Sequence, residues 1–166
     1  MLPPGDTAQP GRFHGRDTEL DALVAAFAAC RGRHEGRAVV VHGDVGVGVS
    51  HLVRHLRDEL RRRGLAHQWW SGRCTRQAPL PYEPMAGLLR DVPGDAAGWL
   101  AEANTAGGPE AGGVALLAGF ARRVRVVASD VPLVVVVDDV DGADASTLRL
   151  LLGVLPLLDD VPVLVL

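Results

Sequence analysis

The amino-acid sequence predicts an α/β fold in which helices cover both faces of a mainly parallel sheet. Segments with the periodicity of strands alternate with segments of helical periodicity along the chain. Residues 132–137 form a continuous hydrophobic run, which is typical of a strand buried on both faces. A glycine-rich turn joins the first expected strand to the next helix. Together these observations predict three layers, with a sheet between two layers of helices.

The composition is that of a folded domain. The chain has 166 residues, of which 48% are hydrophobic and 22% are charged, and this balance excludes an intrinsically disordered chain. The formal net charge of -3 gives no general attraction to nucleic acid or to an anionic membrane. The hydrophobic runs are shorter than the roughly 20 residues of a membrane helix, so we expect no membrane association and a cytoplasmic location. All 17 basic residues are arginine.

The N-terminal part is expected to begin with a flexible lead-in. Residues 1–12 are rich in proline and glycine, and residues 13–166 are expected to form a partial domain. Thr18 stands three residues before Asp21, which is the spacing of a capping box, and apolar residues at helical spacing follow. We therefore expect a first helix that starts there and ends near Gly32.

Alternating strands and helices are expected along the rest of the chain. A β-branched run predicts a buried first strand over 37–42. The later predicted elements are a helix over 50–63, a strand over 66–71, a helix over 83–91, a loop over 95–113, a helix over 114–128, a strand over 132–137, a helix over 145–155 and a strand over 163–166. Because the sequence stops within this last strand, we expect a sheet that is incomplete at the C-terminus and has an exposed edge.

The turn after the first strand has the spacing of a phosphate-binding loop. Residues 43–50 match the pattern G-x-x-x-x-G-K-[ST] at every fixed position except one, because Val49 stands where the pattern has lysine. Glycines at such a turn let backbone N–H groups converge on phosphate oxygens, and the next helix adds its positive N-terminal end. The candidate nucleotide-binding residues are Gly43, Asp44, Val45, Gly46, Val47, Gly48, Val49, Ser50 and His51.

The glycines of this turn have two other interpretations. A tight connection between a strand and a helix also favours glycine, without any ligand. A dinucleotide-binding fingerprint would need a third glycine at position 51 and an acidic residue near position 71, where the chain has His51 and Ser71. The fingerprint therefore fails at two positions.

Two aspartates complete the candidate site. Asp138 and Asp139 follow the hydrophobic strand, and open α/β sheets bind ligands at the carboxyl ends of their strands. We expect Ser50 and Asp138 to hold Mg²⁺, and Asp139 to be the catalytic residue that accepts a proton from the attacking water. The alternative is that the paired aspartates only cap the next loop and keep a hydrophobic strand soluble.

Short motifs along the chain resemble those of one family, the AAA-type, origin-recognition-like P-loop ATPase module in the N-terminal part of large ATP-binding LuxR-type transcriptional regulators. The segments that carry the resemblance are Phe13–Asp17 against F-V-G-R-E, residues 43–53 against G-E-A-G-I-G-K-S-R-L-V, Gly72–Cys74 against G-R-C, Pro81–Pro84 against P-Y-x-P, and Asp138–Asp144 against D-D-L-H-W-A-D. They cover nearly the whole chain from Phe13 onward.

The resemblance implies a P-loop NTPase-like core that binds ATP and Mg²⁺ as a regulatory signalling ATPase. It also implies that Arg16, in the first motif, lies near the adenine. The helix-turn-helix with which the full-length regulators bind DNA has no counterpart in this sequence, so we expect no direct binding of DNA. The chain departs from the family motif at Asp141 and Gly142, which replace His-Trp.

The replacement of lysine by Val49 lowers the expected activity. Lysine sets a positive charge against the β- and γ-phosphates, and loss of such a contact typically costs a few kcal/mol. We therefore expect weak or no ATP hydrolysis. Arg54, one helical turn beyond Ser50, could reach partway back to the phosphates. The alternative function is a pseudo-ATPase scaffold that no longer binds nucleotide and acts through a protein partner or through self-association at the exposed sheet edge.

The remaining features have less specific interpretations. The arginines of helix 50–63 could contact nucleic acid, but such residues more often form a solvated face. Trp69 and Trp70 alternate across a strand, so we expect one in the core and the other under a loop or at an interface. His51 and His55 share a helix face, but no acid or cysteine completes a metal site with them.

Overall fold

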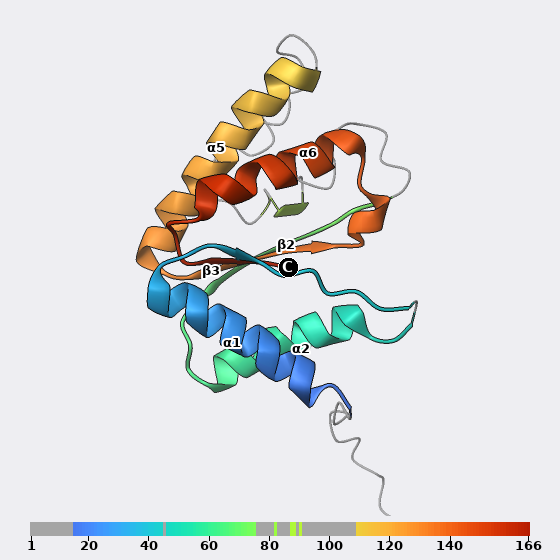
Figure 1. Cartoon of the computed structure of the whole chain (residues 1–166), viewed down its shortest axis with the longest axis vertical. Helices are drawn as coiled ribbons and strands as arrows, with labels where there is room; N and C mark the ends of the chain where they lie inside the picture. The colour runs from blue at the N-terminus through green and yellow to red at the C-terminus, as the bar shows by residue number, and fades with distance from the viewer. Residues whose placement is uncertain (1–14, 45, 76–81, 83–86, 89, 91–108) are drawn as a thin grey trace, which may run out of the picture.

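The computed structural model describes residues 15–44, 46–75, 82, 87–88, 90 and 109–166 (Figure 1). Its helices are α1 (Asp17–Arg33), α2 (Val49–Arg62), α5 (Pro109–Asp130) and α6 (Ala145–Val154), with two 3-10 turns, η1 (Val140–Gly142) and η2 (Leu155–Leu158). Its strands are β1 (Arg37–Ala38), β2 (Gln68–Arg73), β3 (Leu133–Asp138) and β4 (Val163–Val165). Strands and helices therefore alternate along the described chain, as predicted.

The four strands form one parallel sheet in the order β1-β4-β3-β2. The central strand β3 pairs with β2 from Leu133, opposite Gln68, to Asp138, opposite Arg73. On its other side β3 pairs with β4, which in turn pairs with β1. Parallel neighbours need long crossover connections, and the helices between the strands supply them. The predicted α/β class with a mainly parallel sheet is confirmed, and it is consistent with a P-loop NTPase-like core.

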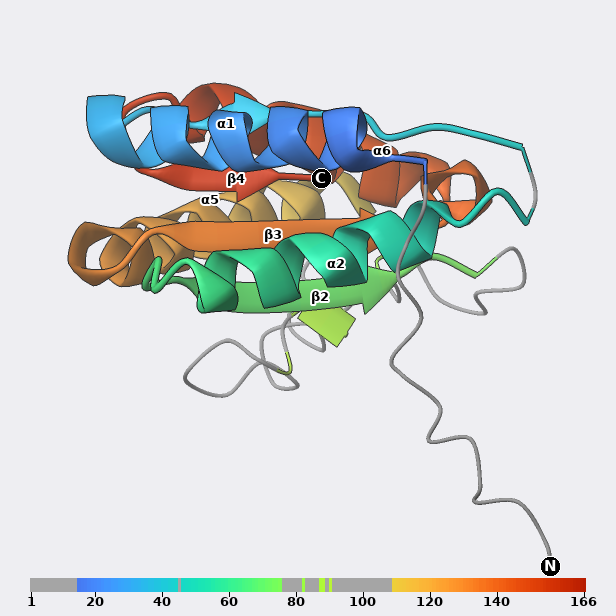
Figure 2. The ribbon, with the colours of Figure 1, turned by 90° about the horizontal axis from the view of Figure 1, so that it is seen from below.

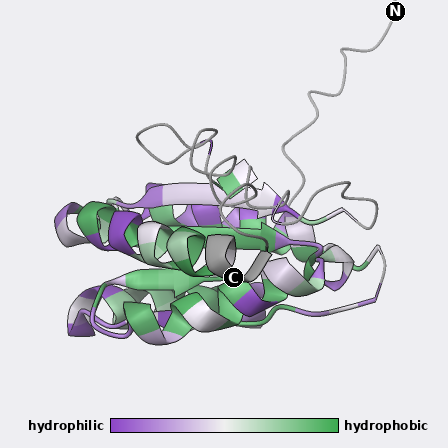
Figure 3. Cartoon of the chain, turned by 90° about the horizontal axis from the view of Figure 1, so that it is seen from above, coloured by the Kyte–Doolittle hydropathy of each residue, from purple (hydrophilic) through white to green (hydrophobic). Residues whose placement is uncertain are grey.

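Helices cover both faces of the sheet. α1 and α2 lie on one face, and α5 and α6 lie on the other (Figures 1 and 2). Successive side chains of β3 point to opposite faces, so Val134 and Val136 join the core under α1 and α2, whereas Leu133 and Val135 join the core under α5 and α6. All four side chains are buried, which confirms the prediction for this strand. Figure 3 shows the hydrophobic centre of the sheet between helices that alternate hydrophobic and hydrophilic residues.

The two tryptophans of β2 lie on opposite faces, as predicted. Trp70 is buried on the α5 face, where its ring meets Phe120 edge-on with the ring centroids 6.2 Å apart. Trp69 is half-buried on the α2 face, and the guanidinium of Arg57 lies 5.4 Å from its ring centroid. Trp70 therefore anchors the larger core, whereas Trp69 lies at the edge of a surface hollow described below.

The start of the first helix differs from the prediction. α1 begins at Asp17, so Thr18 lies inside the helix, and no hydrogen bond from a described side chain caps the helix start. Asp17 and Glu19 stand in the first turn, where negative charge favours the helix N-terminus. The predicted capping box is therefore wrong, and acidic residues near the helix dipole replace it.

The first strand is shorter and less buried than predicted. β1 spans Arg37–Ala38, although the N–H of Val39 still donates to the carbonyl of Val165 at 2.8 Å. Val40 is 81% exposed. In the described sheet β1 has β4 as its one neighbour, so the β-branched run is not covered on all sides. The prediction over 37–42 is therefore right about a strand at Arg37–Ala38 alone, and it is wrong about burial, because no residue of 37–42 is buried.

The helix predicted over 114–128 is longer in the structure. α5 spans Pro109–Asp130, so it begins inside the segment 95–113 that was predicted as a loop. Proline fits the first turn of a helix, where its missing N–H would have no partner in any case. The rest of that loop lies outside the described residues, as does most of the helix predicted over 83–91, of which residues 87, 88 and 90 are helical. The other predicted helices and strands after residue 49 are confirmed to within two residues.

Candidate functional site

The candidate site lies at one end of the parallel sheet. The segment 39–48, which contains the loop 43–48, joins β1 to α2 there, and β2 and β3 end on the same side (Figure 1). Parallel strands present their carboxyl ends along one edge, which is where open α/β sheets bind ligands. The topology therefore gathers the predicted loop and the predicted aspartates, which are far apart in the sequence, at a single edge.

The loop leaves backbone donors free at the start of α2. Gly46 and Gly48 have positive φ angles of 88° and 86°, which glycine adopts without strain. α2 begins at Val49, no acidic residue stands in its first turn, and no hydrogen bond from a described side chain caps it. The first N–H groups of a helix have no partner within the helix and favour an anion. This end of α2 can therefore receive a phosphate; Val45 lies outside the described residues.

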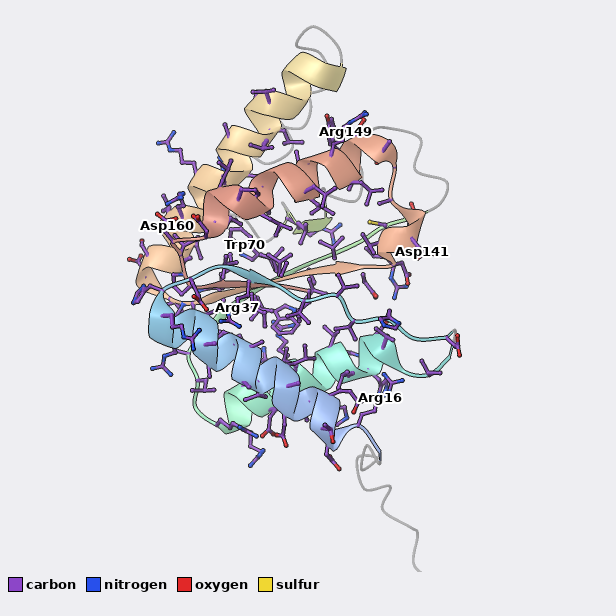
Figure 4. All side chains as sticks on the ribbon, viewed as in Figure 1. Arg16, Arg37, Trp70, Asp141, Arg149 and Asp160 are labelled. Carbon is purple, nitrogen blue, oxygen red and sulfur yellow. The ribbon has the colours of Figure 1, made fainter. Side chains whose placement is uncertain are left out.

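The side chain at position 49 folds back across the loop. A Cβ atom added to Gly43 would lie 2.7 Å from Val47 Cγ2 and 3.3 Å from Val49 Cγ2. The same Cβ position is 3.8 Å from Nη2 of Arg16, which Figure 4 shows beside the loop end of α2. At the position where the pattern has a lysine, this loop therefore has the methyl groups of Val49. The nearest positive charge to Gly43, the first residue of the loop, is that of Arg16.

The two residues predicted to hold Mg²⁺ are hydrogen-bonded to each other. The hydroxyl of Ser50 donates to the carboxylate of Asp138, with 3.2 Å to Oδ2 and 3.3 Å to Oδ1. They meet because α2 starts and β3 ends at the same edge of the sheet. Hydroxyl and carboxylate oxygens suit Mg²⁺, which takes its remaining ligands from water and phosphates. The pair therefore fits that ion.

Sequence reasoning did not identify Arg73 as a residue of the site. Its Nη2 donates to Asp138 Oδ2 at 2.9 Å, and its Nε lies 3.3 Å from Asp139 Oδ2. The hydrogen bond to Asp138 and the charges of both carboxylates raise the pKa of Arg73. The register explains the contact, because Arg73 stands directly opposite Asp138 across β2 and β3. The position of Arg73 in the sequence was a signal for this contact, because Arg73 follows a predicted strand whose end is expected at the same edge of the sheet.

Asp139, the predicted catalytic residue, is exposed and has a left-handed backbone conformation with φ 54°. A non-glycine residue in this region is strained, and a turn holds it here, because the N–H of Gly142 donates to the carbonyl of Asp139 at 2.8 Å. The carboxylate is accessible to water and pairs with Arg73. Its exposure is compatible with accepting a proton from water, and its catalytic role stays a prediction.

The residues next to the site are structural. Asp144 caps α6, because its carboxylate accepts hydrogen bonds from the backbone N–H groups of Ser146 and Thr147. Burial raises the pKa of Asp144, but these hydrogen bonds and one from the Thr147 hydroxyl outweigh burial, so the pKa is lowered. Cys74 follows Arg73 and is buried; burial, and then the nearby aspartates, raise the pKa of its thiol. A protonated thiol is a poor nucleophile, so Cys74 is not a candidate for catalysis.

The described residues contain no metal centre built wholly from protein ligands. Within the described part of the chain, no group of three or more His, Cys, Asp or Glu side chains could hold a metal ion. His51 and His55 lie on α2 with their rings 6.0 Å apart. The described helices also include none that is long and apolar enough to span a membrane.

Comparison with known proteins agrees with this site. Residues 12–166 match the family described as "AAA ATPase domain", which is nearly the whole chain. Curated proteins and solved structures give no match. Members of this family generally use ATP and Mg²⁺, and the glycine-rich loop and the Ser50–Asp138 pair fit both. The chain therefore belongs to the AAA ATPase domain family, and it is a nucleotide-binding, ATPase-like module.

Proposed function

We propose that this chain is a degenerate ATP-binding regulatory module of the kind found in the N-terminal part of LuxR-type transcriptional regulators, with weak or no hydrolysis. The observation that carries the proposal is the hydrogen bond between Ser50 and Asp138, next to a loop that has Val49 in the lysine position. The groups that would hold Mg²⁺ and the phosphates are present. The lysine charge that stabilises phosphoryl transfer is absent.

Each residue has a role in this proposal. The N–H groups of the loop 43–48 and of the start of α2 bind the phosphates, with Arg16 adding positive charge on the same side. Ser50 and Asp138 hold Mg²⁺, which neutralises charge on the β- and γ-phosphates when it is bound. Asp139 accepts a proton from the attacking water. We further propose that the module is cytoplasmic and that any binding to DNA is made by other parts of such a regulator.

The loss of lysine weakens binding without abolishing it. A hydrogen bond to a charged group contributes about 1.5–3 kcal/mol, so its absence lowers affinity by roughly 10- to 150-fold. The backbone donors of the loop and the Mg²⁺ ligands do not depend on position 49. Catalysis suffers more than binding, because charge stabilisation in the transition state is the larger contribution in such sites. We therefore expect a protein that senses ATP more than it consumes it.

The test is a calorimetric titration of Mg·ATP into the wild-type chain and into Val49→Lys. We expect weak binding by the wild-type chain, binding tighter by about tenfold or more in the variant, and phosphate release from the variant alone. Val126→Lys, which adds the same charge at a position that is 62% exposed on α5, is the matched control and should leave binding unchanged. Absence of binding by both the wild-type chain and Val49→Lys at millimolar nucleotide would refute the proposal.

A second candidate function is a scaffold that associates through the edge of the sheet. The observation that favours it is Val40, a β-branched residue that follows β1 and is 81% exposed. In the described sheet β1 pairs with β4 alone, so its other edge carries free backbone groups that can pair with another strand. Sedimentation of the wild-type chain and of Val40→Lys tests this function. Association that Val40→Lys abolishes and that nucleotide does not change would favour the scaffold, and a monomer at all concentrations would exclude it.

A further inference from the structure

A cavity extends from the candidate nucleotide site along α2 and is lined by several arginines. This cavity of about 660 Å³ lies between α2 and the face of β2 that α2 covers, and it reaches Ser50 and Asp138. Arginines dominate its charge: Arg54, Arg57, Arg73 and Arg90 all line it. Among the described residues that line it, Asp138 is the single carboxylate, so four described positive charges face one described negative charge. A cavity with this excess attracts anions.

The arginines that face this cavity differ from the others on α2. Arg61, Arg62 and Arg63 each have a carboxylate partner within the described chain. Arg54 and Arg57 have none there; Arg54 donates to the backbone carbonyl of its own helix, one turn back, at 3.3 Å. Neighbouring carboxylates therefore neutralise the arginines on the side of α2 that faces solvent, whereas the arginines on the side that faces the cavity keep their positive charge.

Arg57 provides an independent sign of a missing partner. Its Nε is buried and has no hydrogen-bond partner among the described residues. The guanidinium is held over the ring of Trp69, 5.4 Å from the centroid, so its position is set by packing. A buried N–H without a partner is costly, and a shift of the guanidinium toward an anion in the cavity that Arg57 lines would relieve that cost. Arginine also binds phosphates and carboxylates with two parallel hydrogen bonds.

The far end of the cavity is too distant for the phosphates of a nucleotide on the loop. Arg57 stands seven residues after Ser50 on α2, which is about 10 Å along a helix axis. Arg73 stands between the two regions, because it lines the cavity and also binds Asp138 at 2.9 Å. An anion held by Arg57 would therefore lie about two helical turns from the Mg²⁺ residues, at the other end of the same cavity, with Arg73 between them.

We propose that this arginine-lined cavity is an effector site for a small phosphorylated molecule with at least two anionic groups. One group binds Arg57 and Arg54, and the other binds Arg90 and Arg73. Drawing Arg73 toward the ligand loosens its ion pairs with Asp138 and Asp139 and leaves the carboxylate of Asp138 free for a metal ion. This site goes beyond the proposed binding of ATP at the loop, and it does not require that binding.

The test is a titration of inorganic pyrophosphate into the full chain, without nucleotide or Mg²⁺, by calorimetry at low ionic strength. We expect saturable binding that weakens at least tenfold in Arg57→Met. Arg61→Met makes the same change one turn further along α2, at a residue that does not line the cavity, and should bind within twofold of the wild-type chain. No binding by the wild-type chain, or equal losses in Arg57→Met and Arg61→Met, would overturn the proposal.

A loop variant separates this site from the nucleotide site. Gly46 has φ 88° and open space around it, so Gly46→Val strains the loop without a clash. We expect Gly46→Val to lose binding of ATP and to keep binding of pyrophosphate. If Gly46→Val loses pyrophosphate as well, the anion was on the loop and the effector site is refuted. Arg54→Met and Arg90→Met repeat the test if the thermal transition of Arg57→Met shows that it is unfolded.

Discussion

Removal of Arg73 should strengthen the binding of a divalent metal ion. Arg73 donates to Asp138 at 2.9 Å and lies 3.3 Å from the carboxylate of Asp139, so an ion that binds Asp138 must compete with a guanidinium already there. Arg73→Met keeps most of the aliphatic stem and removes the charge. The carboxylate of Asp138 then still accepts hydrogen bonds from the hydroxyl of Ser50 and from the backbone N–H of Asp139, each at 3.2 Å.

The expected gain in metal affinity follows from the ion-pair distances of Arg73 and from the exposure of its side chain. Two unit charges 4 Å apart attract by about 4 kcal/mol at an effective dielectric constant of about 20, which is the upper limit. The side chain of Arg73 is 61% exposed, so water and salt screen most of this energy. Exposed ion pairs measured in other proteins contribute about 0.2–1 kcal/mol, and Arg73 makes two. We therefore expect about 1 kcal/mol, which is an affinity for the metal about fivefold higher in the variant.

The assay is a titration with Mn²⁺, a paramagnetic substitute for Mg²⁺, in which the free-ion signal is followed by electron paramagnetic resonance. Arg125→Met is the matched control, because Arg125 pairs with Asp160 on the surface. It should leave the Mn²⁺ affinity unchanged. An affinity in Arg73→Met equal to or weaker than that of the wild-type chain would show that Arg73 does not compete for Asp138.

The other predictions concern stability and reactivity. A Cβ on Gly36 would lie 2.0 Å from the carbonyl oxygen of Leu158, so Gly36→Ala should lose about 1–3 kcal/mol in thermal unfolding, whereas Gly32→Ala, with nothing within 4 Å, should be neutral or more stable. Hydrogen bonds from two neighbouring arginines lower the pKa of Glu59 from 4.5 to about 2, so its contribution to stability is complete above pH 4.5 and is lost as the pH falls toward 2. Acid titrations of unfolding should show this loss in the wild-type chain and not in Glu59→Gln. Burial raises the pKa of Cys30 to about 11, so a thiol reagent at neutral pH should react with Cys30 after denaturation and not before.

The contact between Ser50 and Asp138 could be expected from the sequence because it depends on topology alone. A strand followed by a glycine loop and a helix, together with a hydrophobic strand followed by an acid, places both residues at the carboxyl edge of a parallel sheet. The exact bounds of the strands hardly matter for that conclusion. The Ser50–Asp138 distances of 3.2 and 3.3 Å in the structure agree with this reasoning.

Arg73 could not be identified in the same way, because its contact depends on register. The second strand was expected over 66–71 and is Gln68–Arg73. A shift of two residues keeps every side chain on its face, so the prediction that Trp69 and Trp70 lie on opposite faces, with one of them in the core, is confirmed. The same shift moves the end of the strand from Ser71 to Arg73. The residue opposite Asp138 at the end of the strand is therefore the charged Arg73 and not the neutral Ser71.

The burial of the first strand could not be predicted for a different reason. The β-branched run around Val40 has the composition of a central strand, but burial depends on how many neighbours the strand has in the sheet. In the described sheet β4 is its one neighbour, and Val40 stays 81% exposed. Composition alone does not distinguish a strand covered on both sides from one at an edge.

The double role of Arg73 limits how strongly the two proposed sites can influence each other. If a phosphorylated ligand draws Arg73 away from Asp138, the most it can add to metal binding is the energy of the ion pairs it breaks, which corresponds to about fivefold in affinity. Linkage is reciprocal, so bound metal must raise the affinity for that ligand by the same factor. Arg73→Met should abolish this coupling while Arg57 still binds the anion. A coupling much larger than fivefold, or one that survives in Arg73→Met, would require a different connection between the cavity and the loop.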